Sequence, residues 1–240
     1  LKSIFRKALE WDVILSNPAD RYRLKGMKDP VKREIFESHE LELFYKLLDH
    51  ESERNRLMLL AASLGALRRG EVLGFGVDVI DFESNTVNIT RSLNWDRNLK
   101  QKYLGPTKGK RDRKVIYPES FIKELRLYAF KQNELRWQFG DHWELIDNVD
   151  LLFRTSYGKI MHPQSFTNLW KKIRANMGIK EIDLHDLRHS AASYLIKTGT
   201  EMKVVQEFLG HRNIQTTMDT YVHTTPDDDS KPAKAFEKLL

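Results

Sequence analysis

Apolar residues in this chain recur at helical spacing on both sides of one short segment, in which the spacing shortens. Leu41, Phe44, Tyr45 and Leu48 follow an i, i+3, i+4, i+7 pattern, which is typical of an amphipathic helix. Between residues 77 and 93 the period falls towards two, and a polar turn at 83–85 precedes the alternating part, so a hairpin is predicted there. This order predicts a mostly helical α+β fold with one small sheet.

The remaining elements are predicted from the same pattern and from the prolines and glycines that start or end them. Ser38 is the predicted N-cap of the helix that contains Leu41, Pro163 is expected at the first turn of another, and Gly210 is expected to end a third. A strand is predicted over 114–117 and an amphipathic last turn over 233–240. Helices are predicted over 1–15, 119–139, 163–176, 185–197, 201–209 and 214–222, and around Leu57, Leu60, Ala61 and Leu64.

Residues 19–35 are polar, basic and non-periodic, and they contain Gly26 and Pro30. This composition is typical of a linker. We therefore expect residues 1–30 to be the end of a truncated N-terminal domain with its linker. Residues 31–240 form the main domain and its C-terminal tail.

Composition excludes several classes of protein. Cysteine is absent, which excludes disulfide scaffolds, thiol nucleophiles and thiolate zinc sites. The longest nearly apolar run, residues 57–67, is too short to span a bilayer. The formal net charge of +6 suits a polyanionic partner such as DNA, RNA or anionic lipid, although charge alone leaves open a basic protein without one.

The segment from Arg91 to Lys114 holds nine basic residues and two acidic ones. It joins the predicted hairpin to the next strand and includes glycine and proline. We expect a flexible basic finger that lies along a phosphate backbone, and the alternative is a solvated loop.

The run from Leu184 to Ser190 carries the most chemical information. On a helix, His185 and Arg188 share a face, and a proton donor beside a permanent cation suits a phosphate group. Two alternatives stay open. His185 and His189 have the spacing of a paired zinc ligand, although that motif uses glutamate and no third ligand stands out. The run could also be an ordinary helix start with solvated charges.

Three further residues are candidates for the same site as this run. Arg68 follows an apolar helix, where a lone arginine usually forms a surface ion pair. His211 follows the predicted helix end at Gly210. Tyr221 lies ten residues later, where a lone tyrosine usually packs half-buried.

Together these positions resemble the tyrosine recombinase family, also called phage integrases, over roughly residues 36–225. The first family box resembles residues 66–73 (ALRRGEVL), and the second resembles HDLRH at 185–189, LGH at 209–211 and then Tyr221. The family's hairpin lysine matches Lys108, with Lys110 as the nearest alternative. The chain departs from the pattern at Ala66, where a glycine is usual, and Gly65 lies one position earlier.

The resemblance implies a mixed α+β catalytic domain, a helical bundle with a small antiparallel sheet at one edge, preceded by the end of a core-binding domain. It implies the following site. Tyr221 is the nucleophile that forms a 3′-phosphotyrosyl bond, Arg68 and Arg188 clamp the non-bridging oxygens, His211 adds a hydrogen bond, Lys108 protonates the leaving 5′-oxygen, and His185 handles the tyrosine proton. Glu71 is expected to brace the first box by ion pairing. His189 is expected to be structural or to contact a catalytic residue without touching the DNA.

The implied function is site-specific DNA recombination that integrates or excises a phage or other mobile element, without metal, cofactor or ATP. Double-stranded DNA, a DNA-assembled tetramer of the chain and accessory DNA-bending or directionality factors are the implied partners, and the implied location is the prokaryotic cytoplasm. A type IB topoisomerase and a catalytically inactive DNA-binding module are the alternatives. The C-terminal tail is expected to pack either on its own domain or on a neighbouring protomer.

Overall fold

The computed structural model describes residues 1–21, 34–108, 112–211 and 213–221. The chain divides into two compact units, Leu1–Arg33 and Glu34–Leu240. The described part of the first unit contains the helix α1 (Lys2–Glu10), which buries none of its residues. This helix ends earlier than the predicted range 1–15, because Asp12 adopts a left-handed backbone with φ of 54° and its N–H turns back to the Leu9 carbonyl. The assignment of this unit to a core-binding domain stays a prediction.

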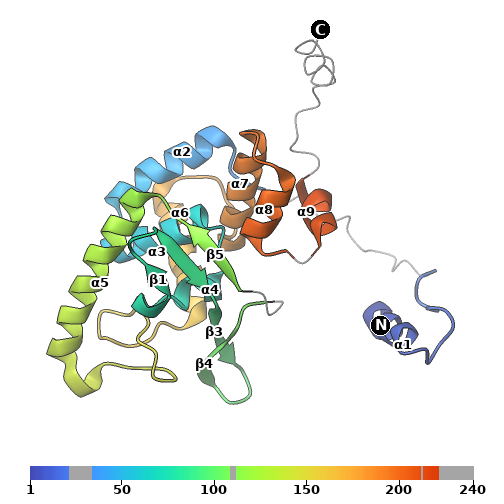
Figure 1. Cartoon of the computed structure of the whole chain (residues 1–240), viewed down its shortest axis with the longest axis horizontal. Helices are drawn as coiled ribbons and strands as arrows, with labels where there is room; N and C mark the ends of the chain where they lie inside the picture. Colours follow the sequence, from blue (N-terminus) through green and yellow to red (C-terminus); the bar gives the residue numbers. More distant parts are fainter. Residues whose placement is uncertain (22–33, 109–111, 212, 222–240) are drawn as a thin grey trace, which may run out of the picture. The chain divides into compact units, whose positions relative to one another are not determined.

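Helices dominate the described part of the second unit, as the periodicity predicts (Figure 1). They are α2 (Ser38–Leu47), α3 (Glu53–Leu64), α4 (Arg69–Leu73), α5 (Glu119–Phe139), α6 (Pro163–Met177), α7 (Leu184–Lys197), α8 (Met202–Leu209) and α9 (Ile214–Tyr221), with single 3₁₀ turns at Leu48–His50, Val77–Val79 and Gly140–His142. Helix α3 buries seven consecutive residues from Leu57 to Ser63, which makes it the central helix of the core. None of the helices in the described ranges is both long and apolar enough to cross a bilayer.

The start of α2 differs by one residue from the prediction. Ser38 is the first residue of the helix, and the N-cap is Glu37. The Glu37 N–H donates to the Glu40 carboxylate over 2.7 Å. In return, the Glu37 side chain accepts from the backbone N–H of Glu40. The two glutamates form a capping box that satisfies both N–H groups, so the N-cap is Glu37 and not Ser38.

The small sheet contains β1 (Ile80–Asp81), β2 (Thr86–Ile89) and β5 (Arg113–Ile116), in the order β1-β2-β5 with antiparallel pairing throughout. Val87 pairs with Val115, and both side chains are buried. Arg113 and Val115 face inwards while Lys114 and Ile116 face outwards, so the alternation of β5 directs one arginine into the protein.

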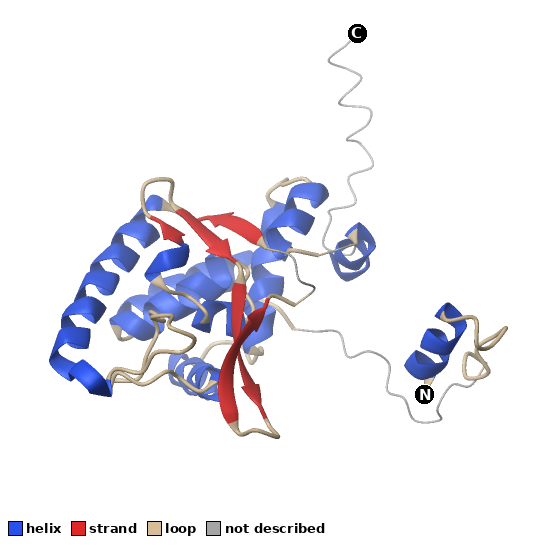
Figure 2. Ribbon diagram, turned by 60° about the horizontal axis from the view of Figure 1, so that its bottom comes forward, coloured by secondary structure: helices blue, strands red, loops and turns tan. Residues whose placement is uncertain are grey.

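The basic segment after β2 is not the flexible finger that we predicted. Most of it forms a second antiparallel pair, β3 (Arg91–Asp96) and β4 (Gln101–Pro106), which projects from the body of the unit (Figure 2). Leu93 pairs with Leu104, and Leu93 is buried. The Asp96 carboxylate accepts from the N–H groups of Asn98 and Leu99 and thereby closes the turn. Apolar cross-strand pairing therefore orders a segment whose charge pattern had suggested a loop.

A second, smaller apolar cluster joins the end of α3 to the C-terminal helices. It contains Ala66, Ala191, Ala192, Ile196, Val205, Leu209 and Tyr221. Helix α8 ends at Gly210, whose left-handed backbone has φ of 65°, as predicted for a C-terminal glycine. This turn directs the chain from α8 towards α9 and so brings the end of α9 against α7. The amphipathic stretch predicted over 233–240 lies outside the described residues.

Candidate active site

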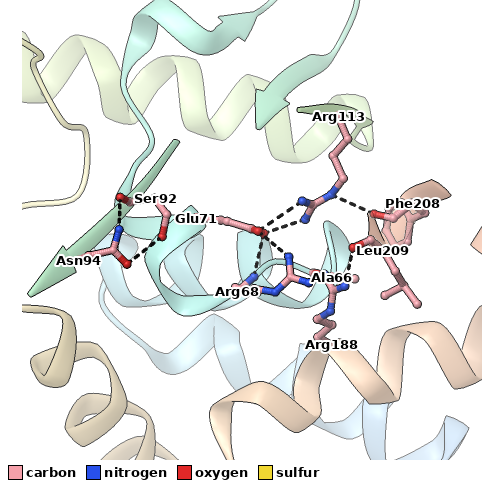
Figure 3. A network of polar contacts seen from close by, with 9 residues as sticks. All are labelled: Ala66, Arg68, Glu71, Ser92, Asn94, Arg113, Arg188, Phe208 and Leu209. Carbon is pink, nitrogen blue, oxygen red and sulfur yellow. Dashed lines mark hydrogen bonds and ion pairs between the residues drawn. The ribbon is translucent and has the colours of Figure 1, made fainter. Parts of the chain in front are cut away.

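One buried carboxylate organises the first part of the site. Glu71 lies in α4, one turn after Arg68, and only 2% of its surface is exposed. It accepts from the Arg68 backbone N–H over 3.1 Å and from the Arg68 guanidinium over 2.8 Å. Arg113 of β5 approaches from the other side, with its Nη2 2.7 Å from the carboxylate (Figure 3). The expected bracing role of Glu71 thus involves two arginines.

The pKa of Glu71 reflects this arrangement. Burial alone would raise it, because a carboxylate is poorly solvated inside the protein. The hydrogen bonds and charge of Arg113, followed by those of Arg68, outweigh burial and lower the pKa to about 2. The carboxylate is therefore ionised throughout the physiological range and fixes both guanidiniums.

Arg113 is a site residue that the sequence reasoning missed. Its Nε donates to the Phe208 carbonyl at the end of α8 over 3.1 Å, while its Nη atoms hold Glu71. One side chain thus connects β5, α4 and the turn that precedes His211 (Figure 3). The inward alternation with Val115 is the signal that could have singled it out among the neighbouring basic residues.

Arg188 occupies the adjacent position, on α7. Its guanidinium donates to the Ala66 carbonyl over 2.5 Å and to the Leu209 carbonyl, and 1% of its surface is exposed. Burial, with the nearby charges of Arg68 and Arg113, lowers its pKa to about 9, so it remains a cation at neutral pH. These two bonds hold the guanidinium between the Ala66 turn and the end of α8.

Ala66 provides one of those carbonyls from an unusual backbone. Its φ is 45°, the left-handed region that side chains disfavour, whereas the preceding Gly65 has a φ of −97°. The left-handed residue is therefore the alanine, at the position where the family usually has glycine. This conformation directs its carbonyl towards Arg188.

His211 follows the left-handed turn at Gly210. Its Nδ1 lies 2.9 Å from the Thr217 hydroxyl, which can donate to it and leave the other ring nitrogen as a donor. Burial, followed by the charges of Arg188, Arg68 and Arg113, lowers its pKa to about 4. His211 is therefore neutral at physiological pH.

Tyr221 is the last residue of α9, and 2% of its surface is exposed. Its hydroxyl lies 2.6 Å from Nδ1 of His189, the histidine that the sequence reasoning expected to be structural. His185, expected to handle the tyrosine proton, packs edge-on against the His189 ring with a centroid distance of 4.9 Å. The ring nitrogen 2.6 Å from the tyrosine hydroxyl therefore belongs to the second histidine of the box.

An open cavity of about 760 Å³ lies beside these groups, and Arg68, Lys108 and His185 all line it. The hairpin contributes Ser92, Asn94, Tyr103 and Gly105 to the same wall. Lys108 lies two residues beyond the end of β4, while the alternative Lys110 falls outside the described residues. The charge of His185 also acts on His211, and that of Tyr221 on Arg188, so the six predicted residues converge on one region.

The arrangement suits an anion. Arg68, Arg69 and Lys108 line the cavity, and the charges of Arg68 and Arg113 act on the neighbouring Arg188. The buried Glu71 carboxylate, which also lines the cavity, is already shared by Arg68 and Arg113. Fixed guanidiniums of this kind match the oxygens of a phosphate group.

Comparison with known proteins identifies the family of the chain. A model of the phage integrase family matches residues 34–227. The chain is 25% identical to a tyrosine recombinase XerC-like protein of Caldanaerobacter subterraneus over all of its own length and 64% of that protein. It is 30% identical to transposase A from transposon Tn554 of Staphylococcus aureus, over 92% of this chain and 57% of the transposase. The chain thus spans 57–64% of the length of these two relatives.

Solved structures show the same fold. The Tn1549 transposon integrase in complex with transposon right end DNA matches the whole chain and 77% of its own, with a TM-score of 0.76 and 20% identity. The catalytic domain of bacteriophage HP1 integrase matches 85% of the chain and 94% of its own, with a TM-score of 0.54 and 18% identity. The chain therefore belongs to the phage integrase family of tyrosine recombinases and has the fold of their catalytic domain, mostly helical with a small antiparallel sheet.

Proposed function

We propose that the chain is the catalytic part of a site-specific DNA recombinase that integrates or excises a phage or other mobile element. The observation that carries the proposal is the convergence of Arg68, Lys108 and His185 on one cavity, with Arg188, His211 and Tyr221 beside it. The names of the relatives, a transposase and a recombinase, support the same function.

In this reaction Tyr221 attacks a DNA phosphodiester and forms a 3′-phosphotyrosyl bond. Arg68 and Arg188 bind the two non-bridging oxygens, where negative charge grows in the transition state. Glu71 holds Arg68 ready before DNA arrives, so little reorganisation is needed during the reaction. The neutral His211 donates a hydrogen bond to the same phosphoryl group.

The leaving 5′-oxygen needs a proton as the P–O bond breaks, and Lys108 on the cavity wall supplies it. The covalent link preserves the energy of the phosphodiester, so a second 5′-hydroxyl can attack it and rejoin the strands. Arginine charges take the electrostatic part that metal ions have in many nucleases.

Recombination needs two DNA sites and several copies of the chain, and we propose assembly on DNA into a tetramer. An apolar groove of about 430 Å³ runs between α2, α7 and α8, and its lining includes the exposed Ile116 and Val204. The stripe Ala233, Phe236 and Leu240 of the tail has the composition to fill such a groove, in its own domain or in a neighbour's. Accessory DNA-bending or directionality factors belong to the same proposal.

The proposal is tested with nicked suicide DNA, which traps the covalent intermediate on a denaturing gel. Wild type should form a covalent band, and Tyr221→Phe should bind the DNA without forming one. Tyr157→Phe is the matched control, since Tyr157 is exposed and lies outside the site residues described above, and it should react like wild type. A covalent band from Tyr221→Phe would place the nucleophile elsewhere. Relaxation of supercoiled DNA without exchange between two sites would favour a topoisomerase.

A further inference from the structure

We propose that His189 is a catalytic residue whose Nδ1 holds the Tyr221 hydroxyl and accepts its proton when the tyrosine attacks DNA. The inference rests on the proposed function, since it concerns the same nucleophile. In this proposal His189, and not His185, is the immediate proton acceptor, so a side chain that the sequence predicts to have a structural or supporting role takes part in the reaction.

The contact between the two side chains carries the proposal. Nδ1 of His189 lies 2.6 Å from the Tyr221 hydroxyl, a short distance for a hydrogen bond, and both residues are at most 9% exposed. Their rings are tilted by 49° with centroids 5.8 Å apart, so the contact is made through the polar edge and not by stacking. The two residues come from the middle of α7 and the end of α9, which are brought together by tertiary packing.

A buried tyrosine needs a hydrogen-bond partner in any case, so the chemistry of the partner decides the interpretation. An amide or a carbonyl would satisfy the hydroxyl without exchanging its proton. Imidazole is the side chain whose ordinary pKa allows proton exchange near neutral pH. A phenol, with an ordinary pKa of about 10, needs such a base to become a strong nucleophile at that pH.

The surroundings suit a developing tyrosinate. Arg188, the residue before His189, is a buried cation whose charge interacts with that of Tyr221. On the other side, the ring of His185 stands at 89° to that of His189 and also lines the cavity. His189 therefore contacts both the nucleophile and His185, a residue of the cavity that would hold the phosphate.

The step balances as follows. The Tyr221 oxygen forms a bond to phosphorus while its proton moves to Nδ1 of His189. The bond from phosphorus to the 5′-oxygen breaks, and the leaving oxygen takes a proton from Lys108. On rejoining, the incoming 5′-hydroxyl returns its proton to the lysine and His189 returns the other to the tyrosine.

The test uses His189→Asn, because the asparagine amide places a hydrogen-bonding atom where Nδ1 lies but takes up no proton at neutral pH. We expect covalent-complex formation in a single turnover to fall by about 10²–10⁴-fold, the range for general base catalysis. DNA binding and the thermal melting of the protein should stay near wild type. His189→Phe, which removes the hydrogen bond as well, should be at least as slow.

Fluorinated tyrosine at position 221 supplies the decisive readout. Fluorine lowers the pKa of the phenol, so the reaction depends less on a base, and the His189→Asn defect should shrink at least about tenfold. The His185→Asn defect, measured in parallel, should not shrink, since that ring does not take the proton directly in this scheme.

Three results would overturn the inference. His189→Asn within about threefold of wild type would show that holding the hydroxyl suffices. An equal defect with tyrosine and fluorotyrosine would show that proton acceptance is not what was lost, and rescue of His185→Asn would return the role to His185. Absence of a covalent band from wild type itself would instead refute the proposed function, which separates the two failures.

Discussion

Replacing Glu71 by glutamine should lower the free energy of unfolding of the second unit by about 3 kcal/mol. The substitution keeps the shape of the side chain and removes the charge that Arg68 and Arg113 share. Lowering the pKa of this carboxyl from 4.5 to about 2 corresponds to about 3 kcal/mol in favour of the ionised form. Breaking a buried ion pair by removing one partner costs about 3–5 kcal/mol, which agrees in size.

The dependence of this loss on pH follows from the direction of the shift. The pKa of Glu71 is lower in the folded protein than in the unfolded chain, so its stabilisation is complete above about pH 4.5 and disappears as pH falls through about 2. The difference between wild type and Glu71→Gln should therefore be the same at pH 7 and at pH 5.

Urea unfolding, followed by circular dichroism at both pH values, measures the loss. Glu53→Gln is the matched control, because Glu53 pairs with Lys131 on the surface, and its midpoint should stay close to wild type. A loss below about 1 kcal/mol, or one that shrinks markedly between pH 7 and pH 5, would refute the reasoning. Cleavage by Glu71→Gln should also fall, since Arg68 loses its fixed orientation.

Arg68→Lys should slow single-turnover cleavage by at least about 10²-fold, because lysine lacks the planar fork that matches two phosphate oxygens, and a rate within tenfold of wild type would contradict this. The Lys108→Ala defect should largely vanish on a 5′-phosphorothiolate substrate, whose sulfur leaves without protonation. Rescue of Lys110→Ala instead would place the general acid two residues later. His211 stays neutral in the folded protein down to about pH 4 but protonates near 6.5 when unfolded, so acidification from pH 7 to pH 5 should destabilise wild type more than His211→Gln. Equal pH dependence of the two proteins would contradict that pKa. Deleting residues 232–240 should spare binding to one site and weaken synapsis of two, which native gels and a two-site recombination assay can separate.

Much of the fold could be predicted from local sequence alone. The ranges of α5 and α6 follow from apolar periodicity bounded by Pro118 and Pro163, and Gly210 marks the end of α8. These features depend on residues within one or two turns of each other, where hydrogen bonding and side-chain entropy act locally. The family boxes also lie in short continuous runs, so the candidate phosphate-binding residues could be proposed from the sequence alone.

Three features of the structure were not predicted by local sequence rules. The cap of α2 is Glu37 because its neighbour Glu40 reaches back to it, although a serine stands next in line. The basic segment forms the β3–β4 hairpin because Leu93 and Leu104 pair across the strands. A count of charged residues takes no account of this apolar contact. The left-handed turn at Ala66 rests on residues that pack against it from elsewhere.

Tertiary structure alone decided how the site is connected. Arg113 meets Glu71 across 42 residues, His189 meets Tyr221 across 32, and Arg188 meets the Ala66 carbonyl across 122. No local pattern specifies such pairs, because each depends on where sheet and helices settle once the shared core is buried. The sequence by itself determined which chemical groups the protein carries and on which elements they lie. Packing determined which guanidinium shares the carboxylate and which histidine holds the tyrosine, since burial leaves each of these polar groups few partners within reach.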